Sequence, residues 1–249
     1  MPRWALLADV HGNRLALAAV LDDLTRRNVD RVINLGDSVY SVLQPRWCAE
    51  QLAQIASISI SGNQDRILFE EVQTAQQNLS YRFVQADLGP NERAWLANQP
   101  ATAIVDDMFC CHGTPSSDTT YLLEHVTPHG VQLQPEAMIL AAIQGVSQSL
   151  IVCGHSHIAR TVQLANGQLI VNPGSVGIPA YNDDLPYPHV MQAGCPHARY
   201  AIVERNAHGW QVEQYAIGYA WQDAALTAQH NGRENLARWL ATGRAQLDD

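Results

Sequence analysis

The segment LIVCGHSH, residues 150–157, passes from a short apolar run directly into a glycine and two histidines. The run is typical of a strand buried on both faces, and Gly154 marks the turn at its end. His155 and His157 are two positions apart on the expected strand-end loop, so both rings can face the same side. Imidazole suits divalent transition metals. The segment therefore predicts a metal site at a strand end, although a solvent-exposed histidine pair would read the same way.

Four other apolar runs end in the same manner, each at a residue with a carboxylate, imidazole or amide oxygen. They are ALLADVHG (5–12), VINLGD (32–37), SISGNQD (59–65) and FCCHG (109–113). In open α/β sheets, ligands bind in the crevice outside the strand ends. We therefore expect one shared metal site, with these candidate ligands: Asp9, His11, Asp37, Asn63, His112, His155 and His157.

Each motif also has a plain structural explanation when it is taken alone. ADVHGN can be a turn in which Asn13 caps the following helix, and the Gly36–Asp37 pair can be an ordinary turn. His112 can be a buried core histidine. A cysteine nucleophile at Cys153 is disfavoured, because no basic or helix-terminus setting that would lower its pKa is visible. The combination of motifs, more than any one of them, supports the metal site.

The number of candidate ligands favours two ions over one. Seven ligands are too many for one tetrahedral zinc, and they suit two divalent ions about 3.5 to 4 Å apart. Two cations so close repel each other, so an anionic group must lie between them, and Asp37 is the candidate bridging carboxylate. Manganese fits this mixture of imidazole and oxygen ligands, with iron, zinc and nickel as alternatives.

Periodicity predicts an α/β chain with a mixed sheet arrangement. The expected strands are 4–8, 31–35, 55–60, 103–111, 150–153 and 168–171, and residues 200–215 read as a hairpin. The expected helices are 14–27, 45–55 and 135–144, with one or two more in 224–245. We predict one domain over residues 1–249, with a helical insertion at about 64–100 and a lid loop at about 182–196.

Composition narrows the classes of function. The chain has 249 residues and is 47% hydrophobic, and it has no apolar run of about 18 residues, which argues against a membrane span. MPRWALLAD reaches an acidic residue too early for a signal-peptide core, and five cysteines, two of them adjacent, favour a reducing cytosol. A net charge of −9 argues against general nucleic-acid binding. A small phosphorylated substrate fits if bound metal supplies local positive charge.

The order D-x-H, G-D, G-N-x-D, H-G, G-H-x-H resembles that of the calcineurin-like metallophosphoesterases, in their small bacterial phosphodiesterase branch. The resemblance covers residues 4–217 and includes NPGSVGIP at 172–179. It implies a four-layer αββα sandwich of two mixed β-sheets flanked by helices, with a dimetal centre at the strand ends. The substrate would be a small phosphorylated molecule.

The resemblance also implies roles for the candidate ligands. One ion would take Asp9, His11 and His157, the other would take Asn63, His112 and His155, and Asp37 would bridge them. A metal-bridging hydroxide would then hydrolyse phosphoesters, as a phosphodiesterase or phosphatase. The alternatives are a dinucleoside polyphosphate hydrolase and a non-catalytic metal-binding scaffold similar to the retromer scaffold subunit. A nuclease is disfavoured by the charge.

Two departures from the family pattern affect the chemistry. After Gly36–Asp37 the chain continues Ser38–Val39–Tyr40, without the acidic and arginine residues that many members carry. Many members also have histidine where this chain has Gln64, and glutamine cannot act as a general acid at neutral pH. We therefore expect a preference for substrates with good leaving groups. We also expect Asn13 and Gln64 to bind substrate.

Overall fold

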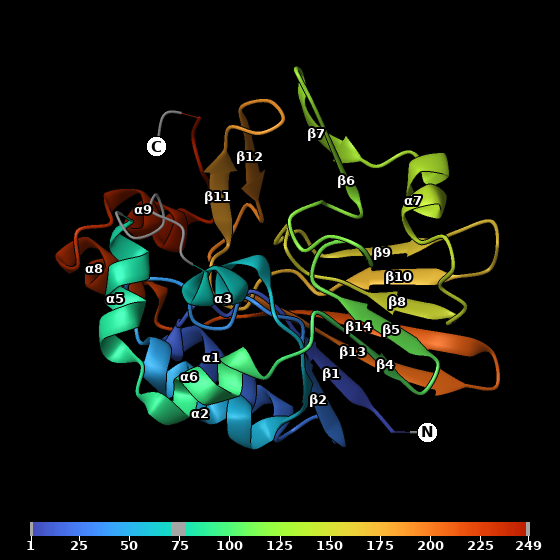
Figure 1. Ribbon diagram of the computed structural model, residues 1–249, viewed down its shortest axis with the longest axis horizontal. Coiled ribbons are helices and arrows are strands. Elements are labelled where there is room, and N and C mark those ends of the chain that lie inside the picture. Colours follow the sequence, from blue (N-terminus) through green and yellow to red (C-terminus); the bar gives the residue numbers. More distant parts are fainter. Residues whose placement is uncertain (1, 71–77, 248–249) are drawn as a thin grey trace.

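Two five-stranded sheets stack face to face in the computed structural model, which describes residues 2–70 and 78–247 (Figure 1). The first sheet has the order β14-β13-β1-β2-β3, and the second has the order β4-β5-β8-β10-β9. Each contains three neighbouring parallel strands and two antiparallel ones. The first sheet comprises β1 (Trp4–Leu7), β2 (Arg31–Asn34), β3 (Ala56–Ser59), β13 (Ala198–Asn206) and β14 (Gly209–Ile217). The second comprises β4 (Thr102–Val105), β5 (Met108–Cys111), β8 (Leu150–Val152), β9 (Arg160–Gln163) and β10 (Leu169–Asn172).

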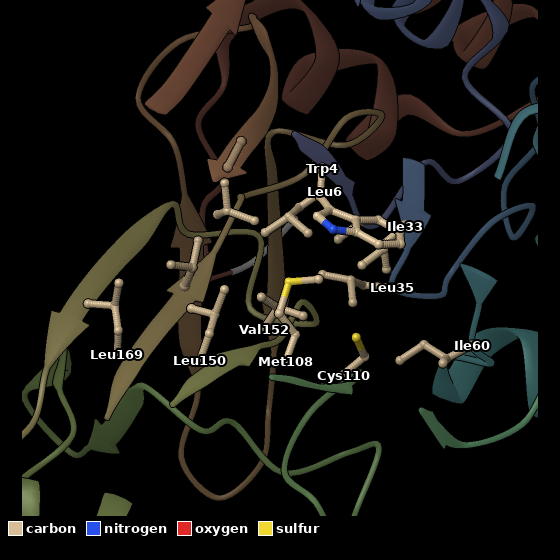
Figure 2. Packing of buried hydrophobic residues seen from close by; sticks show 14 residues of the cluster. Trp4, Leu6, Ile33, Leu35, Ile60, Met108, Cys110, Leu150, Val152 and Leu169 are labelled. Carbon is tan, nitrogen blue, oxygen red and sulfur yellow. The ribbon is translucent and has the colours of Figure 1, made fainter. Parts of the chain in front are cut away.

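Alternation along β1 explains why the sheets are layered. Trp4 and Leu6 point into the space between the sheets, where they meet residues of the second sheet such as Met108 and Val152 (Figure 2). The intervening Ala5 and Leu7 face helices α1 (Arg14–Leu24) and α2 (Pro45–Ile55). Both faces of the central strands are thus buried, as parallel sheets require.

The outer face of the second sheet is covered by α7 (Glu136–Ala142), whose Ile139 packs with Ile151 and Ile170. The layers are therefore helix, sheet, sheet and helix, and the predicted four-layer αββα sandwich of mixed sheets is confirmed. No helix in the described residues has the length and hydrophobicity needed to cross a bilayer.

Further helices lie over the carboxyl ends of the parallel strands (Figure 1). Residues 64–100 contain most of α3 (Asn63–Arg66), then η1 (Ile67–Phe69), α5 (Leu79–Asp87) and α6 (Pro90–Ala97); positions 71–77 lie outside the described residues. The C-terminal helices α8 (Trp221–His230) and α9 (Glu234–Thr242) pack against Val42, Leu43, Ile178 and Ala180.

Three of the differences from the sequence-based expectations are short antiparallel hairpins. Residues 103–111 form two antiparallel strands instead of one, because Asp106 takes a positive φ of 51° and turns the chain. The expected lid loop 182–196 contains strand β12 (His189–Gln192), which pairs with β11 (Ala180–Asp183) to form a hairpin. A second hairpin, β6 (Glu124–Thr127) and β7 (Gly130–Leu133), was not predicted. Each of these strands has four residues, which is too few to show a clear alternation of apolar and polar residues.

Candidate metal centre

Strained backbone marks the loops that follow the parallel strands. Five of the seven candidate ligands have φ between 47° and 69°, in the left-handed region that non-glycine residues rarely adopt: Asp9, His11, Asp37, His155 and His157. Each such residue costs of order 1–3 kcal/mol, which persists only where surrounding structure enforces it. Backbone hydrogen bonds between the loops supply that support, from Asp9 N to Gly36 O (3.0 Å) and from His11 N to Asp37 O (2.9 Å).

The first group of ligand atoms comes from Asp9, His11 and His157, all of which are buried. The Nε2 atoms of His11 and His157 are 3.1 Å apart, and His157 Nε2 lies 3.5 Å from Asp9 Oδ1. His11 Nδ1 donates to the carbonyl of Tyr40 (3.1 Å), and His157 Nδ1 donates to the carbonyl of Ile178 (2.7 Å). Because carbonyls only accept, neutral rings present two Nε2 lone pairs toward each other. A shared cation relieves that repulsion.

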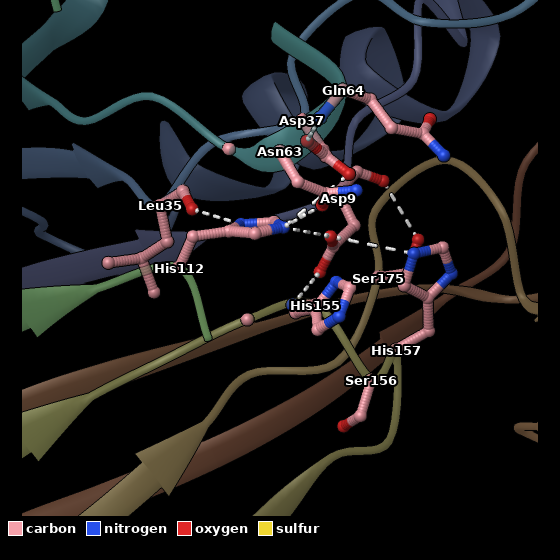
Figure 3. A network of polar contacts seen from close by, with 12 residues as sticks. Asp9, Leu35, Asp37, Asn63, Gln64, His112, His155, Ser156, His157 and Ser175 are labelled. Carbon is pink, nitrogen blue, oxygen red and sulfur yellow. Dashed lines mark hydrogen bonds and ion pairs between the residues drawn. The ribbon is translucent and has the colours of Figure 1, made fainter. Parts of the chain in front are cut away.

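The second group comes from Asp9, Asp37 and His112. His112 Nε2 lies 3.5 Å from Asp37 Oδ2, 3.9 Å from Asp9 Oδ1 and 3.1 Å from the amide oxygen of Asn63. His112 Nδ1 donates to the carbonyl of Leu35 at 2.8 Å, so Nε2 again faces the oxygens. Figure 3 shows the histidine rings gathered around the two carboxylates.

Asp9 provides the direct test of whether these residues fit a metal. Its side chain is fully buried, and Oδ2 accepts from the backbone N–H of His155 at 3.1 Å. Oδ1 has no hydrogen-bond partner among the described residues. A buried carboxylate oxygen without a partner is costly, and coordination to a cation satisfies it. The donor set of carboxylates, imidazoles and an amide therefore fits divalent metal.

The pKa values show that this pocket attracts positive charge. Burial alone would raise the pKa of Asp9 and Asp37, but their histidine neighbours outweigh burial and hold both carboxyls below the ordinary range. For His112, the two carboxylates outweigh burial and raise its pKa to about 10. Burial and a neighbouring histidine lower the pKa of His11 and His155 to about 4, so both are neutral at pH 7. A bound cation would replace the proton on His112.

His155 and Asn63 lie at the edge of the second group. The rings of His155 and His112 are 5.1 Å apart, and His155 stacks on Tyr121 at 4.8 Å. The hydroxyl of Tyr181 donates to the His155 carbonyl at 3.1 Å and lies 3.0 Å from the Tyr121 hydroxyl. The two tyrosines thus hold the His155 segment in place. The segments around them carry no motif that could have identified them from sequence.

Two glycines let the Asp37 and Asn63 loops meet. A Cβ on Gly36 would lie 2.4 Å from the backbone nitrogen of Gly62, and one on Gly62 would lie 2.1 Å from Asp37 Oδ1. Asp65 ties the same loops together, because its buried carboxylate accepts from Ser38 N (3.0 Å) and Gly62 N (3.2 Å). Burial and the charge of Asp37 raise the pKa of Asp65 to about 7.

The structure contradicts the expectation that Asn13 binds substrate. Its side chain is fully buried, Nδ2 donates to Gly177 O and to the Tyr219 hydroxyl, and Oδ1 accepts from Ala16 N. Asn13 caps α1 and braces a neighbouring loop, and every donor it has is used. Cys153 is also buried, which raises the pKa of its thiol and leaves no nucleophile there.

The metal-ligand candidates open onto a cavity of about 230 Å³. Gln64 lines this cavity, and its backbone N–H donates to Asp37 Oδ1 at 2.9 Å, so its side chain remains a candidate for substrate contact. Tyr40, Tyr181 and Arg233 also line this cavity. Arg233 was not predicted, because it lies about 75 residues beyond the last histidine motif and follows no strand.

Two stacked mixed sheets with a buried cluster of carboxylates and imidazoles at their carboxyl edge define an αββα protein with a candidate metal centre. The chain belongs to the calcineurin-like phosphoesterase superfamily, whose domain profile matches residues 3–191. The superfamily predicted from the motif order is thereby confirmed.

The chain is similar to two further proteins. A crystal structure of a metallophosphoesterase from Sphaerobacter thermophilus has a TM-score of 0.76 and 26% identity, and covers 98% of this chain and 99% of that one. An uncharacterized protein of Methanocaldococcus jannaschii is 36% identical over 61 residues, which span 24% of this chain and about a quarter of the relative. The first similarity extends beyond residue 191, so the C-terminal helices belong to a shared fold.

Proposed function

We propose that this chain hydrolyses small phosphoesters with two divalent metal ions bound at the carboxyl ends of its parallel strands. The observation that carries this proposal is the convergence of two ligand groups on Asp9, one of whose buried carboxylate oxygens has no hydrogen-bond partner among the described residues. Membership of a phosphoesterase superfamily supports the reaction class.

One ion would be held by Asp9, His11 and His157, whose ligand atoms lie together. The other would be held by Asn63, His112 and His155, with Asp37 shared between the ions. When bound, such ions lower the pKa of a coordinated water and neutralise phosphate charge. Manganese is the first choice and iron, zinc and nickel the alternatives, because the ligands combine imidazoles with hard oxygens.

The protein's own residues orient the ligands and limit the choice of substrate. The Leu35, Tyr40 and Ile178 carbonyls fix the tautomers of three histidines, so each ring presents Nε2 to the site. Gln64 is near the ligands but cannot donate a proton to a departing alkoxide. The enzyme would therefore favour leaving groups that depart without protonation, such as aryl oxides or phosphates.

A series of aryl phosphate esters with graded leaving-group pKa tests this preference. The rate should fall steeply as the leaving-group pKa rises. A flat dependence, measured where the chemical step limits the rate, would contradict the missing-acid argument.

The decisive experiment couples metal analysis to a substrate panel. Wild type, Asp37→Asn and the control Asp223→Asn, which alters an exposed carboxylate on α8, are assayed with aryl monoesters, aryl diesters and a dinucleoside polyphosphate. We expect two metal ions per chain and turnover in wild type and control, with both reduced in Asp37→Asn. Stoichiometric metal without turnover of any ester would favour a non-catalytic scaffold, and full activity in Asp37→Asn would contradict the shared-ligand role.

A further inference from the structure

Arg233 is the one arginine that lines the active-site cavity within the described part of the chain. The chain has 15 arginines and no lysine, so no lysine supplies a cation there. The position lies beyond the matched superfamily region, in the link between α8 and α9. Figure 1 shows these helices beside α5 on the side of the molecule where the strands end.

The Arg233 side chain is held by neutral partners. Nε donates to Asn235 Oδ1 at 3.1 Å, and Nη1 donates to the hydroxyl of the buried Ser80 at 2.5 Å. Guanidinium has five N–H donors. Two are used in these bonds, so three remain, one on Nη1 and two on Nη2. The two bonds fix the orientation of the planar group and leave N–H donors on both Nη1 and Nη2.

No carboxylate within residues 2–70 or 78–247 forms an ion pair with Arg233. Several other arginines do pair with aspartate or glutamate, as Arg160 does with Glu124. Arg233 is half-buried, and this burial lowers the pKa of its guanidinium although the group stays charged. Removing a cation partly from water without an anionic partner is unfavourable. An anion from solution would offset that cost.

Tyr40 connects this cation to the metal-ligand cluster. Its carbonyl accepts from His11 Nδ1 at 3.1 Å, and Tyr40 lines the same cavity as Arg233. The cavity is thus lined both by candidate metal ligands and by a fixed guanidinium.

A purely structural role accounts for only part of this arrangement. Arg233 is the N-cap residue of α9, and its bond to Ser80 ties α9 to α5. Its backbone N–H also donates to Ala228 O at 2.9 Å. The two side-chain hydrogen bonds, to Asn235 and Ser80, need only N–H donors and no charge. They do not explain the positive charge of Arg233 or its three remaining N–H donors.

We propose that Arg233 binds a second, non-scissile phosphoryl group, so the natural substrate carries two phosphoryl groups; this rests on the proposed function. The remaining N–H donors on Nη1 and Nη2 suit a bidentate contact with an oxyanion, and a phosphoryl group offers this cation more negative charge than a carboxylate does. One phosphoryl group lies at the metal cluster and the other at Arg233. Where the second group is also the leaving group, its departure as phosphate needs no proton, which agrees with Gln64.

Isothermal titration with non-hydrolysable ligands tests the proposal on the manganese-loaded protein. The probes are methylphosphonate and bisphosphonates whose two groups are joined by one to four methylenes. At least one bisphosphonate should bind wild type about 10- to 100-fold more tightly than methylphosphonate, the range expected for charge-assisted hydrogen bonds. Arg233→Met should abolish that advantage, while the control Arg244→Met, at an exposed position outside the cavity, should keep it.

A second variant keeps the test valid if Arg233→Met does not fold. Arg233→Lys retains the charge but loses the planar fork, and should keep only part of the advantage. Equal affinity of wild type for all the phosphonates would overturn the proposal, and so would an unchanged advantage in both Arg233 variants. So would an ω-phosphonocarboxylate that binds as tightly as the bisphosphonate of the same length.

The same experiment separates this proposal from the proposed function. Bisphosphonate binding that depends on Arg233, in a protein that hydrolyses no phosphoester, would support the phosphoryl subsite and remove the enzymatic role. Hydrolysis of aryl phosphates by a wild type without any bisphosphonate advantage would support the enzyme and remove the subsite.

Discussion

Asp37→Asn should nearly abolish the stabilisation of this protein by divalent metal. Asp37 is 2% exposed, its Oδ1 accepts from Gln64 N at 2.9 Å, and its Oδ2 lies 3.5 Å from His112 Nε2 and 4.0 Å from His11 Nε2. Asparagine keeps the shape and one acceptor oxygen. It removes the negative charge that lies between the two candidate ligand groups.

The size of the effect follows from linkage. Free metal at about 100 times its dissociation constant stabilises the folded state by about 2.7 kcal/mol per site. For a domain of this length, 1 kcal/mol corresponds to about 2–4 °C in Tm, so wild type should gain about 5–11 °C per site. If the substitution weakens binding about 100-fold, the same metal concentration yields only about 0.4 kcal/mol, or about 1 °C.

The assay is thermal unfolding of chelator-treated protein with and without added Mn²⁺, repeated with Zn²⁺. Comparing each variant with its own metal-free form cancels any change in apo stability. Asp223→Asn, at the exposed position on α8, should show the wild-type shift. A full metal-induced shift in Asp37→Asn would refute the shared role of this carboxylate.

Three further predictions concern packing, loop geometry and proton supply. Leu6→Ala removes a fully buried side chain between the sheets and should cost about 3 kcal/mol in denaturant unfolding, whereas a loss below about 1 kcal/mol would contradict the packing described. Gly62→Ala places a Cβ 2.1 Å from Asp37 Oδ1, so metal titration should reveal weakened binding, and unaltered affinity would count against the close loop contact. Gln64→His should accelerate hydrolysis of alkyl phosphates by about 10²-fold in steady-state assays while changing aryl phosphates little; equal acceleration of both would argue against a general-acid effect.

The position of the candidate site was predictable because parallel strands carry strong local signals. Strands β1, β2, β5 and β8 each read as an apolar run that stops at a glycine or polar residue. The strand-end rule then places Asp9, Asp37, His112 and His155 at one edge without knowledge of the strand order. The rule works here because all six parallel strands present the same edge of the sandwich.

The walls of the cavity were not predictable in the same way. Arg233 and Tyr181 reach the site from a helix junction and from a short hairpin, and nothing in their local sequence reports the tertiary contact. Asn13 shows the opposite error. Its closeness in sequence to His11 suggested a substrate contact, but the helix cap turns its amide into the protein. Local spacing therefore identified the strand-end residues, and packing decided what surrounds them.

The charge distribution joins these observations to the choice of substrate. A net charge of −9 disfavours the approach of a polyanion, yet its effect is screened over about 10 Å at moderate salt. Inside the cavity the nearby charges dominate, because divalent cations held by the buried carboxylates would make the site positive. Arg233 adds a second cation on the same cavity, away from any carboxylate that pairs with it among the described residues. We therefore expect this cavity to select small ligands with separated negative groups.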